Sequence, residues 1–174
     1  MRKKLILITG GARSGKSRFA EELARKFPGP QAYLATAQAL DEEMAERIRR
    51  HRNLRGPDWE TLEEPLSVAE SVAGAGERFR LILLDCLTLW ISNLMMAGRT
   101  EEGILAEGDR LVQACREAAA SVIVVGNEVG LGIVPDNAPS RMFRDLSGLV
   151  QQKVAREADE VYFLVSGIAQ RIKG

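Results

Sequence analysis

The sequence predicts an α/β protein in which a mostly parallel central sheet is covered by helices on both faces. Apolar runs bounded by turn residues recur along the chain, and their hydrophobicity is continuous rather than alternating. Strands that are covered on both faces have this pattern. Segments with helical spacing separate the runs, so we expect right-handed crossovers between parallel strands. The expected strands are 5–9, 31–36, 80–85, 121–126 and 160–167.

Six segments are expected to be helices because their apolar residues recur every three or four positions. They are 15–27, 40–53, 65–75, 86–97, 101–120 and 139–158. In parallel sheets, ligands bind beyond the carboxyl ends of the strands. The polar residues that end or follow the apolar runs are therefore the first candidates for a functional site. They are Thr9, Thr36, Asp85, Asn127 and Glu128.

Composition and charge predict one domain over residues 1–174 and argue against nucleic-acid and membrane partners. Of the 174 residues, 45% are hydrophobic, which is enough for a sizeable core. Lys plus Arg and Asp plus Glu number 24 each, so no net charge favours nucleic acid or an anionic membrane. The apolar runs are far shorter than the about 20 residues of a membrane-spanning helix. Cys86 and Cys115 lack C-x-x-C spacing and are expected to be buried free thiols, which fits a reducing cytoplasm.

Residues 10–17 read GGARSGKS and match the phosphate-binding pattern G-x-x-x-x-G-K-S. A glycine loop between a strand and a helix presents backbone N–H groups to an anion, and the helix dipole adds positive potential there. Lys16 supplies a charge for the outer phosphates, and the Ser17 hydroxyl is placed to bind Mg²⁺. A chance match is the alternative. The apolar run before the loop and the amphipathic segment after it favour a nucleotide site.

Asp85 closes the apolar run RLILLD, at the position expected for the carboxylate of a magnesium site. The alternative is that Asp85 caps the following helix, since aspartate is a favoured cap residue. The two roles are compatible.

His51 is the only histidine of the chain, and it lies among several arginines in the stretch RIRRHRNLR. On a helix it would share a face with Met44 and Ile48, which is the pattern of a partly buried histidine at the end of an apolar stripe. The alternative is a nucleophile. Neighbouring positive charge lowers the pKa of an imidazole, keeps it neutral and suits a triphosphate. From the residues alone, the structural interpretation is favoured.

Two further segments carry open alternatives. Gly130 and Gly132 follow the fourth strand, and they predict either a loop that touches a ligand or a turn with unusual backbone angles. Arg141 and Arg144, followed by Asp145, suit either a phosphate or an ion pair at a subunit interface.

Eight segments, in order, resemble the bifunctional adenosylcobinamide kinase/adenosylcobinamide-phosphate guanylyltransferases of cobalamin biosynthesis, and the resemblance covers nearly the whole chain. They are GGARSGKS (10–17), YLATA (33–37), EMAERIRRHR (43–52), W-x-T-x-E (59–63), LLDCLT (83–88), NEVGLGIVP (127–135), R-x-F-R-D (141–145) and ADEVYFLVSGIAQRIK (158–173). The first and the sixth are far more specific than the general loop pattern.

The resemblance implies a three-layer, RecA-like P-loop NTPase fold and a homotrimer. It implies that ATP or GTP, with Mg²⁺, phosphorylates the aminopropanol hydroxyl of adenosylcobinamide. It further implies that GMP from GTP is attached to a histidine and passed to the new phosphate, which gives adenosylcobinamide-GDP and pyrophosphate.

Carried over residue by residue, the resemblance makes His51 and Lys16 the catalytic residues, and Ser17 and Asp85 the metal ligands. The residues expected to bind nucleotide are Gly10, Gly11, Ala12, Arg13, Ser14, Gly15, Lys16, Ser17, Ala35, Thr36, Ala37, Arg52, Glu63 and Asp85.

The sequence departs from the family's pattern in two places. The family often has serine where Ala37 stands, so a hydroxyl contact is absent there. Some members have two adjacent histidines where this chain has Arg50 and His51. If the family's nucleophile aligned with Arg50, this chain would lack it.

Two other functions would share the loop and Asp85. A P-loop small-molecule kinase without guanylyltransferase activity would have no need of His51. A RecA-like ATPase acting on DNA would carry a basic or aromatic surface, and the neutral charge and nine aromatic residues (5 Phe, 2 Trp, 2 Tyr) argue against it.

Overall fold

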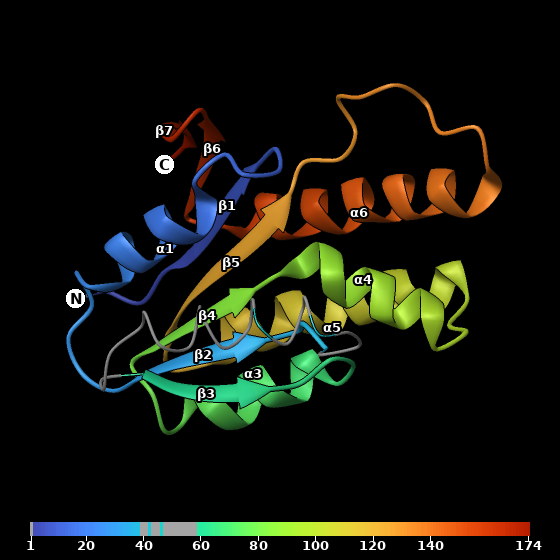
Figure 1. The fold of residues 1–174 in the computed structure, drawn as a ribbon. Helices are drawn as coiled ribbons and strands as arrows, with labels where there is room; N and C mark the ends of the chain where they lie inside the picture. Colours follow the sequence, from blue (N-terminus) through green and yellow to red (C-terminus); the bar gives the residue numbers. More distant parts are fainter. Residues whose placement is uncertain (1, 39–41, 43–45, 47–58) are drawn as a thin grey trace.

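A computed structural model describes residues 2–38, 42, 46 and 59–174, which form one seven-stranded sheet with helices packed on it (Figure 1). The strands are β1 (Leu5–Gly10), β2 (Gln31–Ala35), β3 (Trp59–Glu63), β4 (Leu81–Asp85), β5 (Ser121–Asn127), β6 (Glu160–Val165) and β7 (Ile168–Lys173). The helices are α1 (Lys16–Ala24), α3 (Val68–Gly76), α4 (Leu87–Met96), α5 (Glu101–Glu117) and α6 (Ala138–Glu157). Most of the expected helix at 40–53 lies outside the described residues.

The strand order is β3-β2-β4-β5-β1-β6-β7, and every neighbouring pair is parallel except β6 with β7. The expectation of a mostly parallel sheet is confirmed. β4 lies two strands from β1 on one side, whereas β6 and β7 lie on the other. The carboxyl ends of the six parallel strands therefore meet along a single edge, and the loops that follow them are neighbours.

Two strands were not expected, and they are the two edges of the sheet. β3 reads WETLE, in which only Trp59 and Leu62 are apolar and no residue is fully buried, and β7 reads IAQRIK and is largely exposed. The expectation rested on continuous apolar runs, which mark strands covered on both faces. Edge strands are not fully covered, so that criterion misses them.

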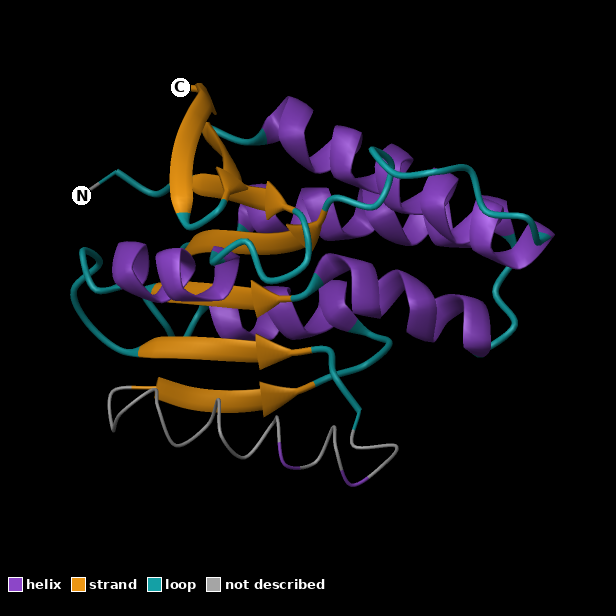
Figure 2. Ribbon diagram, turned by 45° about the horizontal axis from the view of Figure 1, so that its top comes forward, coloured by secondary structure: helices purple, strands orange, loops and turns teal. Residues whose placement is uncertain are grey.

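Successive residues of each strand supply opposite faces of the sheet, which makes two apolar layers. Ile6 and Ile8 pack with α1, whereas Leu5 and Leu7 pack with the helices of the opposite face. That second layer is thicker, because α3, α4, α5 and α6 all contribute to it around the fully buried Trp90 (Figure 2). Each such aliphatic side chain contributes about 1.5–3 kcal/mol when it is fully buried.

Side-chain caps define where the long helices begin. The Thr100 hydroxyl accepts a hydrogen bond from the Gly103 N–H at 3.1 Å and starts α5. The Asn137 side chain accepts one from the Ser140 N–H at 2.9 Å and starts α6. Each cap satisfies one of the backbone donors that the first turn of a helix leaves free.

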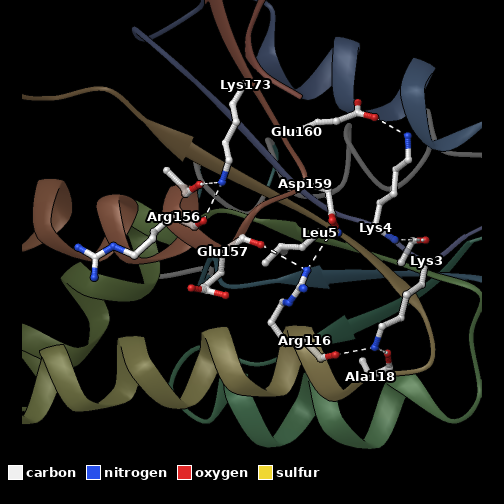
Figure 3. A network of polar contacts seen from close by, with 12 residues as sticks. Lys3, Lys4, Leu5, Arg116, Ala118, Arg156, Glu157, Asp159, Glu160 and Lys173 are labelled. Atoms are coloured by element: carbon white, nitrogen blue, oxygen red, sulfur yellow. Dashed lines mark hydrogen bonds and ion pairs between the residues drawn. The ribbon is translucent and has the colours of Figure 1, made fainter.

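Lysine side chains close the carboxyl ends of α5 and α6 at the amino edge of the sheet (Figure 3). Lys3 Nζ donates to the backbone oxygens of Arg116 and Ala118. Lys173 Nζ donates to those of Ala155 and Arg156, at 2.9 and 2.7 Å. A positive charge at this end of a helix is favoured by the helix dipole. These contacts join both ends of the chain to the amino edge, opposite the edge where the functional site is expected.

The ionisation of Glu160 makes the stability of the fold depend on pH. Hydrogen bonds from Lys4 and then Tyr162 hold the pKa of Glu160 below its usual range. The charged Glu160 carboxylate therefore stabilises the fold at pH values above the pKa that Glu160 has in the unfolded chain. This contribution is lost as the pH falls through the lower pKa that Glu160 has in the folded protein.

We expect Glu160→Gln to lower the free energy of unfolding at pH 7 by about 1 kcal/mol, because the charged hydrogen bond is lost while Lys4 remains partly exposed. Urea denaturation at several pH values measures the difference between the variant and the unchanged protein. That difference should shrink as the pH falls below about 4. A difference independent of pH would show that the carboxylate charge is not responsible.

Both cysteines are free and buried, as the sequence predicts. Burial raises the pKa of Cys115 to about 12, so this thiol stays protonated. Of the helices that the structure describes, none combines the length and the apolar character needed to cross a membrane.

Candidate active site

The glycine loop joins β1 to α1, as the sequence predicts, and its glycines occupy positions that other residues would strain. Gly15 has a φ of 95° at the cap of α1. Gly10 has a φ of 152°, and a Cβ atom there would lie 2.5 Å from the backbone oxygen of Leu164. Glycine adopts such angles without a steric penalty. The loop can therefore turn sharply into α1 and point its backbone N–H groups outward from the first turn of that helix.

The turn between β6 and β7 supports the loop from one side. The Gly167 N–H donates to the Ser14 backbone oxygen at 2.9 Å. A Cβ atom on Gly15 would lie 3.2 Å from the Gly167 Cα atom, so the two backbones are in close contact. The sequence did not predict β7, and this support was missed with it.

Lys16 is buried at the start of α1, with 6% of its surface exposed. Its Nζ atom donates to the Gly11 backbone oxygen at 2.6 Å and lies 3.4 Å from the Ser14 hydroxyl. Burial lowers the pKa of Lys16, and the negative charge of Asp85 opposes that shift. The ammonium group is thus held inside the curve of the loop.

Asp85 ends β4 and meets the first turn of α1. Its Oδ2 atom accepts hydrogen bonds from the Ser17 hydroxyl at 3.2 Å and from the Tyr33 hydroxyl at 2.7 Å. The two residues expected to bind a metal are therefore in contact, although they are 68 positions apart in the chain.

The oxygen atoms of Ser17 and Asp85 suit Mg²⁺, which prefers hard oxygen ligands and usually shares them with the phosphates of its substrate. Among the described residues, no group of three or more His, Cys, Asp or Glu could hold a metal ion by itself. Two oxygen ligands suit a cation whose remaining ligands are phosphate oxygens and water.

Cys86 follows Asp85 in the chain, and its side chain is buried. Burial, and then the charge of Asp85, raise the pKa of the Cys86 thiol. Its Sγ atom accepts a weak hydrogen bond from the Leu89 N–H at 3.4 Å and caps α4. The thiol is therefore a neutral structural group in this position.

The turn after β2, expected to contact a nucleotide, begins with Ala35 beside Asp85 in the sheet register. Thr36 is fully buried, and its hydroxyl pairs with the Cys86 backbone, donating to the oxygen at 2.8 Å and accepting from the N–H at 2.9 Å. Asn93 donates to the Thr36 backbone oxygen at 2.8 Å. In the structure, the Thr36 side chain therefore joins the residue after β2 to the residue after β4.

We expect Thr36→Val to lower the free energy of unfolding by about 1–3 kcal/mol, because two backbone groups of Cys86 lose a partner in a buried place. Thr36→Ser keeps the hydroxyl and is the matched control. Urea denaturation of both variants measures the effect. Valine keeps the methyl group and loses only the hydroxyl, so a Thr36→Val variant as stable as the unchanged protein would show that these hydrogen bonds contribute little.

Glu63 ends β3 in the same register row as Ala35 and Asp85. Two strand spacings separate Glu63 from Asp85, about 10 Å at the backbone. Glu63 is exposed, so it lies at the functional edge of the sheet with its carboxylate open to solvent.

Asn127 ends β5 next to the glycine loop and is held by groups from two helices. Its backbone N–H and its side chain both donate to the Thr88 hydroxyl, at 3.3 and 3.0 Å. Its backbone oxygen accepts from Gln151 at 2.9 Å, and the other end of the Gln151 amide accepts from the Thr9 hydroxyl at 2.8 Å. Gln151 therefore bridges the ends of β1 and β5. It was missed because nothing in the local pattern of α6 distinguishes it.

The segment between β5 and α6 extends away from the sheet above α6 (Figure 1) and exposes apolar side chains, including Leu131 at 81% and Ile133 at 96%. Arg141 donates to the backbone oxygens of Pro135 and Asp136, so it holds the end of this segment against the first turn of α6. Arg144 pairs with Asp145 at 3.3 Å within the chain. His51 and Arg52, the remaining expected site residues, lie outside the described residues.

Similar proteins are found over nearly the whole length of the chain. The sequence model of the family described as "Cobinamide kinase / cobinamide phosphate guanyltransferase" matches residues 6–172. The "Bifunctional adenosylcobalamin biosynthesis protein CobP" of Pseudomonas aeruginosa is 43% identical over 168 residues, which cover 97% of this chain and 96% of that protein. The "Bifunctional adenosylcobalamin biosynthesis protein CobU" of Salmonella typhimurium is 42% identical over 181 residues, which cover 97% of this chain and 99% of that protein.

A solved structure supports the fold alone. "Crystal structure of the RadB recombinase" matches with a TM-score of 0.55 at 16% sequence identity, over 92% of this chain and 73% of that one. The expectation of a RecA-like α/β fold is confirmed.

Proposed function

The chain belongs to the family of cobinamide kinases and cobinamide phosphate guanyltransferases, and from that premise we propose that one P-loop site serves both transfers on adenosylcobinamide. The chain is a transferase of cobalamin biosynthesis. It first phosphorylates adenosylcobinamide with ATP or GTP, and it then uses GTP to convert the phosphate to adenosylcobinamide-GDP.

The observation that carries this proposal is the grouping of Lys16, Ser17 and Asp85 at the carboxyl edge of the sheet. In the kinase step, the aminopropanol oxygen forms a bond to the γ-phosphorus, and the bond to the β,γ-bridging oxygen breaks. The loop N–H groups and the Lys16 ammonium hold the phosphates and offset their charge. Ser17 and Asp85 would hold Mg²⁺, whose charge, when it is bound, further stabilises the leaving phosphates.

We propose that the second transfer proceeds through His51. A neutral imidazole nitrogen attacks the α-phosphorus of GTP, and the bond to the α,β-bridging oxygen breaks, so pyrophosphate leaves. An oxygen of cobinamide phosphate then attacks the same phosphorus, and the histidine nitrogen leaves. His51 is the only histidine of the chain, so a histidine intermediate has no other possible location. Arg52 and its neighbouring arginines would offset the charge of the phosphates.

The remaining residues of the site have supporting roles in this proposal. Glu63 and the turn at Ala35–Ala37 would contact the nucleotide from the β2–β3 side of the edge, a role supported by the register, in which Ala35 lies between Glu63 and Asp85. A homotrimer and a cytoplasmic location follow from the family resemblance, and the two free thiols fit a reducing compartment.

A labelling experiment tests the proposal. The protein is incubated with Mg²⁺ and GTP carrying ³²P at either the α- or the γ-phosphate, without corrinoid, and then denatured. Label from α-labelled GTP should stay on the protein and be released by acid, as expected for a phosphorus–nitrogen bond. Label from γ-labelled GTP should not stay. Absence of α-label, together with phosphorylation of cobinamide, would favour a kinase without the second activity.

A further inference from the structure

The chain has two tyrosines, and each donates a hydrogen bond of 2.7 Å to a carboxylate. Tyr162 donates to Glu160 near the amino edge, whereas Tyr33 donates to Asp85 at the functional edge. The chemistry described above assigns no task to Tyr33. We propose that Tyr33 is a positioning residue that orients the Asp85 carboxylate for the Mg²⁺–nucleotide complex, an inference that rests on the proposed function.

The sheet register places Tyr33 where only a long side chain reaches Asp85. Tyr33 on β2 lies opposite Leu83 on β4, and Asp85 is two residues further along β4. Residues two apart on a strand share a face, so the Tyr33 and Asp85 side chains lie on the same side of the sheet. Diagonal neighbours of this kind are within reach of an aromatic side chain.

The Tyr33 ring is held before any ligand arrives. It is buried, with 5% of its surface exposed, in the apolar layer under α1. Its ring lies edge-on to that of Trp59, with a centroid distance of 6.2 Å and an interplanar angle of 76°. A ring fixed by packing on these sides presents its hydroxyl at one place, so the hydrogen bond to Asp85 costs little further ordering.

Both hydroxyl donors to Asp85 use the same oxygen, Oδ2. Within the part of the chain that the structure describes, no hydrogen bond to the other oxygen, Oδ1, is found. Ser17 is itself an expected metal ligand, so its bond to Asp85 competes with metal binding. Tyr33 is not an expected ligand, and its bond is independent of the cation. Tyr33 is therefore the group that can keep the carboxylate oriented while Mg²⁺ is bound. Hydrogen bonds of this kind around metal ligands typically change metal affinity by about 10–100-fold.

Tyr33→Phe removes this hydroxyl and keeps the ring against Trp59. We expect Mg²⁺ to bind about 10-fold more weakly to the protein loaded with a non-hydrolysable GTP analogue. Titration with Mn²⁺, followed by electron paramagnetic resonance, measures the affinity without turnover, and competition with Mg²⁺ completes the measurement. Affinity for the analogue in EDTA should equal that of the unchanged protein. In activity assays, the Mg²⁺ concentration for half-maximal rate should rise, and saturating Mg²⁺ should restore kcat.

Tyr162→Phe is the matched control, because it removes an equal hydrogen bond to a carboxylate away from the site. It should lower stability and leave the metal affinity unchanged. A second control uses Asp85→Asn: in that background, Tyr33→Phe should cause no further loss of metal affinity, since the two side chains act as a unit.

Unchanged metal affinity in Tyr33→Phe would overturn the role of Tyr33. An equal loss in Tyr33→Phe and Tyr162→Phe would also overturn it, because the effect would then come from general destabilisation. If the unchanged protein bound nucleotide without any dependence on Mg²⁺, the proposed function would fail as well, so the two failures are distinguishable.

Discussion

Lys16→Met is expected to abolish both transfers, with kcat/KM for cobinamide phosphorylation falling by about 100- to 1,000-fold or more. Lys16 is the ammonium group held inside the glycine loop, at 2.6 Å from the Gly11 oxygen. Both reactions develop negative charge on phosphates that this loop holds, so both lose their main fixed positive charge. Steady-state rates with adenosylcobinamide and GTP measure the first transfer, and the amount of α-label on the protein measures the second.

The folded state should tolerate this change. Methionine keeps an unbranched apolar side chain, and the position is already buried, so no charge needs to be desolvated there. Urea denaturation should therefore show stability equal to or above that of the unchanged protein. The same substitution at Lys26, exposed just beyond α1, is the control and should leave rates unchanged. Rates within a few-fold of normal in Lys16→Met would show that the loop does not hold the reacting phosphates.

His51→Gln is expected to separate the two activities. The second transfer should fall by at least about 1,000-fold, because its nucleophile is missing. The kinase step does not use this residue and should stay within about twofold. Adenosylcobinamide phosphate should accumulate, and no label from α-labelled GTP should remain on the protein. Mass spectrometry of the corrinoids and counting of the denatured protein measure both results.

Arg50→Gln is the control for this substitution, since it changes the preceding residue and keeps the imidazole. It should still acquire the label, although more weakly if the arginine helps to bind the triphosphate. Label that survives His51→Gln would show that another residue carries the GMP.

The parts of the site that were predictable from sequence are those encoded by short local patterns. The glycine loop, with Lys16 and Ser17, follows from eight consecutive residues, and Asp85 follows from its place at the end of an apolar run. Because β1 and β4 run parallel, their carboxyl ends lie at the same edge of the sheet, and Ser17 and Asp85 are in contact there.

The parts that were missed depend on which strands become neighbours. The bond from Tyr33 to Asp85 requires β2 and β4 to be adjacent, and the bridge from Gln151 requires α6 to cross the ends of β1 and β5. Hydrophobic periodicity predicts neither the adjacency of β2 and β4 nor the position of α6. Thr36 illustrates the same point. Its hydroxyl pairs with the backbone of Cys86, 50 residues away at the cap of α4, and this pairing likewise requires β2 and β4 to be neighbours, whereas its contact with a nucleotide stays a prediction.

The most direct test is a time course in which the protein is incubated with adenosylcobinamide, GTP and Mg²⁺, and the corrinoid products are identified by mass. We expect adenosylcobinamide phosphate to appear first and adenosylcobinamide-GDP to replace it as pyrophosphate is released. If GTP is consumed or bound but neither product forms, the chain does not carry out these two transfers.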